Sequence, residues 1–550
     1  MNLIRITLKD GAARRCRSNT PVSQLLKKPC DPHGLPYIGC RVNNDIVSLT
    51  YPLDVNASVL FLTMTDAAGM RIYRASLTFL LAKAASTLYP ERRFCIEHSL
   101  GTGLFCRFAA TPGITTRQVA ALEAAMRSLV SRNLPIRRRK LAFADALEHF
   151  ARRGFRDKVN LLRFHNPPKV VVYECEGFTD LAHGPLAPAT GTLRWFKLIH
   201  YPPGVVLQLP TREAPRRVAP FQDQRQLFQI FHEHKVWGRI LGVTNVGKLN
   251  ELIANGNVGE FIRVAEALHE KKIARIADRI SARRAQLRAI LISGPSAAGK
   301  TTFAKRLAVQ LEVNGLQPVI ISLDDYYVDD AETPHGADGR PDYEHIRALD
   351  AELFNQHLRQ LFAGQTVELP RFNFEAKRRE RNGAPLKLRS GQIVIIEGIH
   401  GLNPRATYRI PARQKFKIYI SALTQLAVDA HNRISTTDNR LMRRLVRDHA
   451  NRGNSALATL RMWPSVRRGE KRWVFPFQAS ADATFNSALD YELAVLKPLV
   501  EPLLMQVKPA DYEYAEARRL QEFLLHFLAV PQQAVPATSL LREFIGTRRN

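Results

Sequence analysis

The chain has 550 residues, and 80 Lys and Arg against 50 Asp and Glu give it a formal net charge of +30. This length exceeds what one hydrophobic core supports, so several folded domains are expected. No run approaches the roughly 18 apolar residues of a membrane-spanning helix, the N-terminus lacks the apolar core of a signal peptide, and the six cysteines contain no C-x-x-C pair. The composition therefore argues against a membrane protein, a secreted disulfide scaffold and a zinc site, and a cytoplasmic protein is expected.

The positive charge is concentrated in the first half of the chain. Residues 1–288 contain 44 Lys and Arg and 22 Asp and Glu, a net +22, whereas residues 289–550 contain 36 and 28, a net +8. An excess of this kind can attract RNA or another polyanion without reading its sequence, and it can equally serve to keep the protein in solution.

The first 220 residues are predicted to form small α+β units. Short apolar stretches that alternate with polar residues predict strands, and apolar residues at helical spacing predict helices. Strands are expected at 3–8, 46–50, 58–63, 169–174 and 205–209. One helical segment is expected to begin at Pro21, and two more are expected at 71–88 and 118–130. A segment rich in Pro and Arg at 210–220 indicates a linker.

The second half is predicted to be an α/β domain with a parallel sheet. A helical pattern over 222–287 leads directly into the apolar run 289–293. Beyond it, three further strands alternate with helical segments, as a parallel sheet requires; they are expected at 318–323, 392–398 and 415–421.

A phosphate-binding loop follows the first of these strands. The motif G-x-x-x-x-G-K-[ST] opens a predicted helix, in the order strand, loop, helix that such loops demand. Its backbone N–H groups can wrap phosphates, Lys300 can reach the β- and γ-phosphates, and the Thr301 hydroxyl can bind Mg²⁺. The residues assigned to nucleotide binding are Gly294, Pro295, Ser296, Ala297, Ala298, Gly299, Lys300, Thr301 and Thr302.

Acidic residues follow the next two apolar strands. Asp324 and Asp325 come after 318–323, and Glu397 ends the strand at 392–398. Because the carboxyl ends of parallel strands line the active crevice, a carboxylate there can accept the proton of an attacking hydroxyl or help to hold Mg²⁺. Either aspartate could serve as the base, and a strand-end aspartate can also be a plain helix cap. A later helical segment carries an arginine group that could face an anion.

Together these features resemble the uridine kinase family, within the wider group that contains phosphoribulokinase, over about residues 289–510. The resemblance implies that Asp324 is the general base, acting with Lys300, and that Glu397 lies near magnesium. Glu344, which precedes His345, would bind ribose hydroxyls. The lid segment of the family implies nucleotide-binding roles for Arg443, Arg447 and Arg452, and the acceptor would contact Tyr327, Phe372 and Arg444.

The sequence also departs from the family pattern. Phe372 or Phe374 stands where the family usually has a Tyr that contacts the base, Lys377 stands for a His, and Asn454 replaces a lid Arg. Since hydrogen bonds to the base edge give such sites their discrimination, uridine or cytidine does not follow as the acceptor. Lys377, Arg378 and Arg379 could instead accommodate a phosphorylated sugar. The segments 462–470 and 485–492 also look like one bacterial subgroup of these kinases, without an evident physical role.

The front of the chain resembles two accessory domains of threonyl-tRNA synthetase. Residues 1–65 look like a TGS domain, a small β-grasp module, and residues 66–215 are similar to the second additional domain, which performs editing in that enzyme. The four positions that carry the editing His and Cys residues are here Ala75, Phe79, Ala182 and Leu186. None of these side chains can bind a metal or move a proton, so an inactive editing fold is predicted.

The predicted architecture is an α/β multidomain protein: a β-grasp module at 1–65, an α+β editing-like domain at 66–215, a helical linker at 216–288, a P-loop kinase domain at 289–525 and a tail at 526–550. The predicted function is an ATP- and Mg²⁺-dependent kinase acting on a small-molecule hydroxyl, of a nucleoside in the first place. The alternatives are a kinase for a phosphorylated sugar and an RNA-binding regulator that uses the P-loop as a nucleotide switch. RNA is a candidate partner of the basic half, a homo-oligomer is an open option, and no membrane partner is expected.

Overall fold

The computed structural model describes residues 3–9, 11–109, 113–336, 339–380 and 383–546. The chain forms two compact units, each built from segments that are separated in the sequence. The first unit contains residues 1–254, 425–434 and 507–528, and the second contains 255–424, 435–506 and 529–550. Two segments of the predicted kinase region, 425–434 and 507–528, thus pack with the front half of the chain. The predicted domain boundaries themselves stay a prediction.

The first unit opens with a five-stranded mixed sheet in the order β2-β1-β7-β4-β5. Strand β1 pairs in parallel with β7 and antiparallel with β2, and alternation along β1 buries Ile4 and Ile6 while Arg5 faces solvent. The strands are β1 (Leu3–Leu8), β2 (Ala13–Arg17), β4 (Gly39–Val42), β5 (Asp45–Val47) and β7 (Ala57–Leu62), with a short β3 (Thr20–Pro21) and β6 (Pro52–Leu53) pair. The predicted strands at 3–8, 46–50 and 58–63 are thereby confirmed within a few residues.

Two antiparallel sheets and a long buried helix follow in the same unit. Helix α1 (Ala67–Leu88) is apolar on most sides, and its residues Leu77, Leu80 and Leu81 lie in the core between α2 and the four-stranded sheet β13-β14-β9-β8. The sheet strands are β8 (Phe94–Leu100), β9 (Gly103–Phe108), β13 (Lys197–Tyr201), β14 (Gly204–Gln208) and, in a second sheet, β10 (Arg137–Ala142), β11 (Lys169–Cys175) and β12 (Phe178–Leu181). The helices are α2 (Thr116–Ser131), α3 (Phe143–Arg152), α4 (Arg156–His165), α5 (Arg225–Ile240), α6 (Val246–Ala254) and α13 (Tyr514–Leu524).

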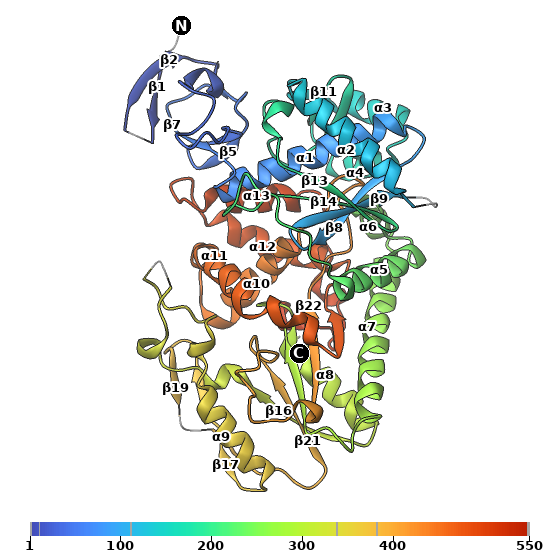
Figure 1. The fold of residues 1–550 in the computed structure, drawn as a ribbon, viewed down its shortest axis with the longest axis vertical. Coiled ribbons are helices and arrows are strands. Elements are labelled where there is room, and N and C mark those ends of the chain that lie inside the picture. The colour runs from blue at the N-terminus through green and yellow to red at the C-terminus, as the bar shows by residue number, and fades with distance from the viewer. Residues whose placement is uncertain (1–2, 10, 110–112, 337–338, 381–382, 547–550) are drawn as a thin grey trace. The chain divides into compact units, whose positions relative to one another are not determined.

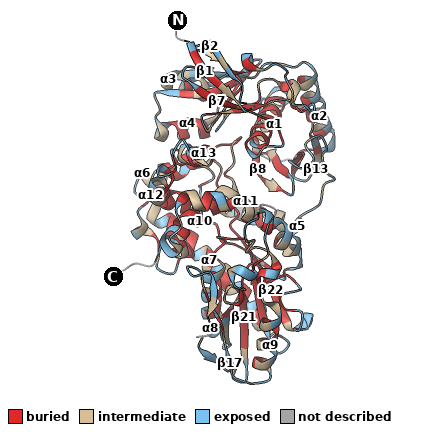
Figure 2. Ribbon diagram, turned by 90° about the vertical axis from the view of Figure 1, so that its left-hand side faces the viewer, coloured by how far each residue is buried: buried red, intermediate tan, exposed pale blue. Residues whose placement is uncertain are grey.

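The second unit is built on a five-stranded parallel sheet in the order β16-β21-β15-β22-β23. Strand β15 (Ala289–Ser293) lies in its centre, beside β21 (Gln392–Glu397) and β22 (Lys415–Ser421), with β16 (Gln317–Ser322) and β23 (Ala483–Asn486) at the edges. Every strand predicted for this half is confirmed, and the parallel sheet with it. The central strands are buried on both faces, as Figure 2 shows for β21 and β22, which explains their continuous apolar runs.

Helices cover both faces of this sheet (Figure 1). Alternate residues of β15 point to opposite sides: Ile290 and Ile292 pack with α7 (Val258–Ser281) and α8 (Lys300–Val313), whereas Ala289 and Leu291 pack with α9 (Ala351–Phe362). The remaining helices of the unit are α10 (Thr436–Arg452), α11 (Ala456–Trp473), α12 (Glu492–Met505) and the short α14 (Arg542–Ile545). Two small hairpins complete it, β17 (Val367–Glu368) with β20 (Pro385–Leu386) and β18 (Arg371–Asn373) with β19 (Arg378–Glu380).

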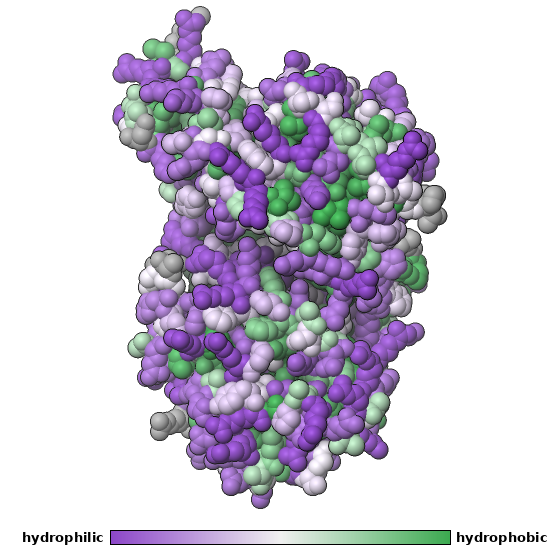
Figure 3. Space-filling view, in the orientation of Figure 1, coloured by the Kyte–Doolittle hydropathy of each residue, from purple (hydrophilic) through white to green (hydrophobic). Residues whose placement is uncertain are grey.

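The surface is mainly hydrophilic on the face seen in Figure 3. Within the described ranges, no helix is both long and apolar enough to cross a bilayer.

Candidate active site

The phosphate-binding loop connects the central strand β15 to helix α8, at the point where the sheet order reverses. Gly294 passes so close to the neighbouring strand that a Cβ there would lie 2.2 Å from the carbonyl oxygen of Ile420. Gly299 caps α8 with a φ of 84°, and Ala297 also has a positive φ of 58°. Both glycines are therefore required by backbone geometry, as predicted for a loop that turns its N–H groups inward.

Glu397, at the carboxyl end of β21, links this loop to the neighbouring strand. Its Oε1 accepts hydrogen bonds from the hydroxyls of Thr301, at 3.2 Å, and Ser322, at 2.9 Å. Glu397 is 4% exposed, and this burial, together with the nearby Asp324 carboxylate, raises the pKa of Glu397. An oxygen-only pair of a hydroxyl and a carboxylate suits Mg²⁺. Thr301 and Glu397 are the residues that would hold Mg²⁺ here; no group of three His, Cys, Asp or Glu suited to a metal occurs among the described residues.

Asp324 and Asp325 differ in how their side chains are engaged. Asp325 Oδ1 accepts a hydrogen bond from the backbone N–H of Phe372 at 3.3 Å, and burial raises the pKa of Asp325. Asp324 is held by its own backbone N–H, which donates to Ser322 Oγ at 3.3 Å. Its charge contributes to the raised pKa values of Glu397, Glu344 and Tyr327. Asp324 thus lies among the acidic and phenolic groups of the crevice, while Asp325 ties the hairpin strand β18 to the loop.

The residues predicted to contact the acceptor lie beside Asp324. Tyr327 and Phe372 form a buried aromatic pair, with ring centroids 5.8 Å apart, and Phe374 packs on Phe372 at 5.1 Å. Burial raises the pKa of Glu344 to about 7, although the Arg444 guanidinium acts to lower it. Tyr327, Phe372 and Phe374 thus pack together, and the charges of Asp324 and Arg444 act on the buried Glu344 carboxyl group.

The predicted nucleotide-binding arginines all come from α10, and their surroundings differ. Arg443 is fully buried, pairs with Glu492 and donates to the carbonyl oxygens of Ser487, at 2.8 Å, and Ala297, at 3.4 Å. Arg447 and Arg452 share the buried Asp448, at 2.9 and 3.7 Å. Arg443 thus supports the loop by binding backbone carbonyl oxygens. Arg447 and Arg452 are more exposed, with 15% and 27% of their side-chain surface accessible.

Three residues around the loop were not assigned a role from the sequence. Glu470 and Ser487 lie in the two segments, 462–470 and 485–492, that had no evident role: Glu470 accepts from the Ser296 N–H at 3.0 Å, and Ser487 Oγ donates to the Ala298 carbonyl at 2.6 Å. Glu543, from α14, accepts hydrogen bonds from the N–H of Thr302 at 3.2 Å and from its hydroxyl at 3.0 Å. The only available signal was the family likeness of the first two segments, and Glu543 had none.

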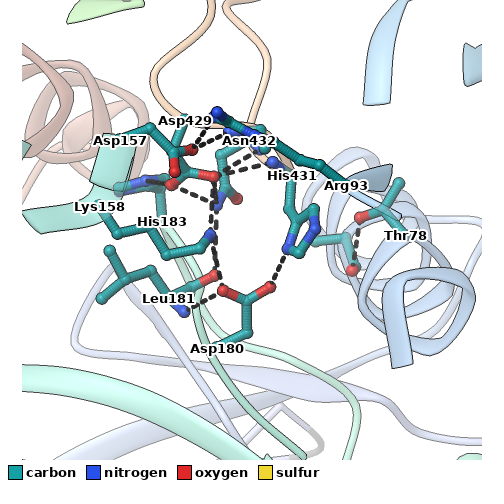
Figure 4. Close-up of polar contacts among 12 residues, drawn as sticks. Thr78, Arg93, Asp157, Lys158, Asp180, Leu181, His183, Asp429, His431 and Asn432 are labelled. Atoms are coloured by element: carbon teal, nitrogen blue, oxygen red, sulfur yellow. Dashed lines mark hydrogen bonds and ion pairs between the residues drawn. The ribbon is translucent and has the colours of Figure 1, made fainter. Parts of the chain in front are cut away.

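A buried ionic cluster lies in the first unit (Figure 4). Lys158, on α4, contacts Asp180 Oδ1 at 2.7 Å and Asp429 Oδ1 at 2.9 Å, and His431 Nδ1 lies 2.5 Å from Asp180 Oδ2. Burial alone would lower the pKa of Lys158, but the two aspartates hold it above its ordinary value. The segment 425–434 therefore supplies a counter-ion that the front half needs in order to bury this lysine.

The four positions of the editing residues lie in the hydrophobic core of the first unit. Phe79 and Leu186 are 4% and 1% exposed, and Ala75 and Ala182 pack against the same cluster. Phe79 meets the ring of Phe178 in an edge-to-face contact with centroids 5.2 Å apart. These positions therefore serve packing here, and their carbon-only side chains offer no group for hydrolytic chemistry.

Comparison with known proteins finds different relatives for the two halves of the chain. Residues 289–494 match the model of the "Phosphoribulokinase / Uridine kinase family". The front half matches threonine–tRNA ligases: the protein of Desulforamulus reducens is 32% identical over 199 residues, which are 36% of this chain and 31% of that one. The protein of Acidithiobacillus ferrooxidans is 34% identical over 196 residues, 35% of this chain and 30% of that one. The chain thus spans about a third of the length of these relatives.

Two solved structures were matched to part of this chain. A "Possible Uridine Kinase" from Bacillus stearothermophilus is 19% identical, with a TM-score of 0.26, and the match covers 39% of this chain and 98% of that one. The D-glycerate 3-kinase of Cryptococcus neoformans is 13% identical, with a TM-score of 0.22, covering 48% of this chain and 89% of that one.

Proposed function

Because residues 289–494 carry a region of the phosphoribulokinase and uridine kinase family, we propose that the protein is an ATP-dependent kinase whose acceptor is a nucleoside hydroxyl. In the proposed reaction, Asp324 accepts the proton of the acceptor hydroxyl as its oxygen bonds to the γ-phosphorus, and the bond to ADP breaks. Lys300 and the N–H groups of the loop neutralise the transferred phosphoryl group. Mg²⁺, held through Thr301 and Glu397, would supply further charge compensation.

The link made by Glu397 carries this proposal. Through its bonds to Thr301 and Ser322, this one carboxylate joins the nucleotide loop to the strand end that bears Asp324 two residues later. A nucleotide switch requires the loop but has no need of an acceptor carboxylate fixed beside it. The arrangement therefore favours phosphoryl transfer to a second substrate.

Nearby cations already have carboxylate partners, which favours a nucleoside over a phosphorylated sugar as the acceptor. Lys377 Nζ lies 4.0 Å from an oxygen of Asp330, and Arg379 forms an ion pair with Asp350 at 2.8 Å. Two of the three cations that could have bound a sugar phosphate are thus already partly or wholly neutralised. The aromatic wall of Tyr327, Phe372 and Phe374 offers instead a surface on which a planar base can pack.

The test is a screen for ADP release from ATP with nucleosides and phosphorylated sugars as acceptors. We expect turnover with at least one nucleoside, and loss of at least a hundredfold in kcat for Asp324→Asn with ATP binding retained. Asp325→Asn is the matched control and should keep most of the activity. Turnover by Asp324→Asn at a rate near that of the wild type would make Asp325 the candidate base, and turnover only with phosphorylated sugars would exclude the nucleoside.

RNA binding by the first unit is a second proposed function. Arg5 and Arg15 lie directly opposite each other on β1 and β2, and Arg17 follows on the same exposed face. Like charges in a cross-strand pair are unfavourable unless an anion compensates them. Affinity of the full chain for single-stranded RNA, measured against salt concentration, should fall steeply and should weaken when these three arginines are replaced by Gln. A flat salt dependence would remove this proposal.

A further inference from the structure

Helix α11 contacts the phosphate-binding loop through the buried carboxylate of Glu470. One oxygen of Glu470 accepts the N–H of Ser296 at 3.0 Å, and the carboxylate also pairs with Arg440, which in turn donates to the Ser296 carbonyl oxygen at 2.9 Å. Glu470 and Arg440 are 0% and 1% exposed. A fully buried ion pair thus grips one residue of the loop at both its N–H and its carbonyl group.

The preceding residue of α11 touches the acceptor side of the crevice. A Cβ added to Gly469 would lie 2.2 Å from Cβ and 2.9 Å from Cγ of Glu344. Non-bonded carbon atoms do not approach so closely, so a methyl group at position 469 must displace the Glu344 side chain or α11 itself. The glycine is therefore required for the close approach of α11 to the segment that carries Glu344.

Two consecutive residues thereby contact the two halves of the crevice. Glu470 is hydrogen-bonded to the loop proposed to bind the donor phosphates, and Gly469 lies directly against the side chain of Glu344 on the acceptor side. Neither residue is aimed at substrate: Glu470 is occupied by Ser296 and Arg440, and Gly469 has no side chain. Their common effect is to fix how far the two substrate-binding parts lie from each other.

We infer that Gly469 and Glu470 are positioning residues that set the separation of the phosphate donor loop and the acceptor carboxyl Glu344. This inference rests on the proposed kinase function. Phosphoryl transfer depends on the attacking oxygen and the γ-phosphate meeting within a narrow range of distance, and a misplacement of about 1 Å can cost roughly a hundredfold in rate. The two residues give α11 a reason to carry the pair Gly-Glu at this point, which the sequence had left without a role.

The inference predicts different defects for the two positions. In Glu470→Ala the loop loses its support and Arg440 is left without its partner, so we expect ADP affinity to fall about tenfold and kcat with it. Glu470→Gln keeps an oxygen for the Ser296 N–H but loses the ion pair, and should be intermediate. Gly469→Ala should leave ADP affinity within about twofold of the wild type while raising KM for uridine, or lowering its kcat, by about tenfold to a hundredfold.

The experiment uses the full chain, with ADP titrated by calorimetry, uridine-dependent ADP release and a thermal melt for each variant. Lys471→Gln, at the exposed neighbouring position of α11, is the control and should match the wild type. A Glu470→Ala variant with unchanged ADP affinity, or a Gly469→Ala variant with unchanged uridine kinetics, would overturn the inference. Equal loss of both properties in both variants would also do so, because it would indicate a general structural defect.

Failure of the proposed function is distinguishable from failure of this inference. If the wild type releases no ADP with uridine or with any other nucleoside of the screen, the proposed function is wrong. The ADP titrations then decide the inference: weakened binding in Glu470→Ala with normal binding in Gly469→Ala and Lys471→Gln supports it, and any other pattern contradicts it.

Discussion

Replacing Glu543 is predicted to tighten nucleotide binding. The carboxylate of Glu543 accepts hydrogen bonds from the N–H and the hydroxyl of Thr302, at 3.2 and 3.0 Å. Thr302 belongs to the loop predicted to bind phosphate, and its N–H cannot serve both the carboxylate and a nucleotide. Nucleotide binding therefore has to displace Glu543, and it also has to bring phosphate charge toward a carboxylate.

The size of the effect follows from the strength of these contacts. A hydrogen bond to a charged group contributes about 1.5–3 kcal/mol net when buried, and the Thr302 contact is only partly buried. If the state in which Glu543 binds Thr302 is favoured by about 1.4 kcal/mol, only about one molecule in ten has Thr302 free for the nucleotide. The apparent Kd for the nucleotide is then raised about tenfold. Glu543→Gln keeps the size of the side chain but removes its charge, so we expect ATP to bind about three- to tenfold more tightly.

The assay is calorimetric titration of the full chain with ATP at a fixed salt concentration. Glu522→Gln, which removes a carboxylate from an exposed position on α13, is the matched control and should bind ATP as the wild type does. An unchanged or weaker affinity in Glu543→Gln would refute the reasoning, since the carboxylate would then not compete with phosphate.

Two further predictions concern stability. Lys158→Ala leaves Asp180 and Asp429 buried without their counter-ion, and should lower the free energy of unfolding by about 3–5 kcal/mol; a loss below about 1 kcal/mol in urea unfolding would contradict this. Burial lowers the pKa of His98 and of His269 from 6.5 to about 3, so the unfolded chain binds more protons between these values and stability is lost as pH falls from about 6.5 toward 3. The free energy of unfolding from urea titrations should fall from pH 7 to pH 5 by up to about 2 kcal/mol for each histidine, more than in variants with Gln at these positions; equal pH slopes would contradict the assignment.

The sequence determined the local parts of this protein. The phosphate-binding loop was predictable because its strand, glycines, lysine and helix are consecutive, and its motif fits within nine positions. The strands of the parallel sheet were predictable because burial on both faces leaves continuous apolar runs. Asp324 and Glu397 could be assigned to one crevice because the carboxyl ends of parallel strands share an edge. Strands β4, β8, β9, β12 and β13 were not predicted, and neither were β2 and β10, whose Arg-rich sequences carry little apolar pattern.

Only the tertiary structure decided what surrounds these parts. Glu470 reaches Ser296 across 174 positions, and Glu543 reaches Thr302 across 241. Lys158 pairs with Asp429 across 271 positions, in a unit assembled from three separate segments. In the sequence each of these side chains looks like an ordinary surface charge. A buried charge is stable only with a partner, and these partners lie too far away in the sequence for local spacing to reveal them. The sequence therefore predicted the residues of the crevice, whereas the fold alone decided which charges lie against the loop and which hold the rest of the chain together.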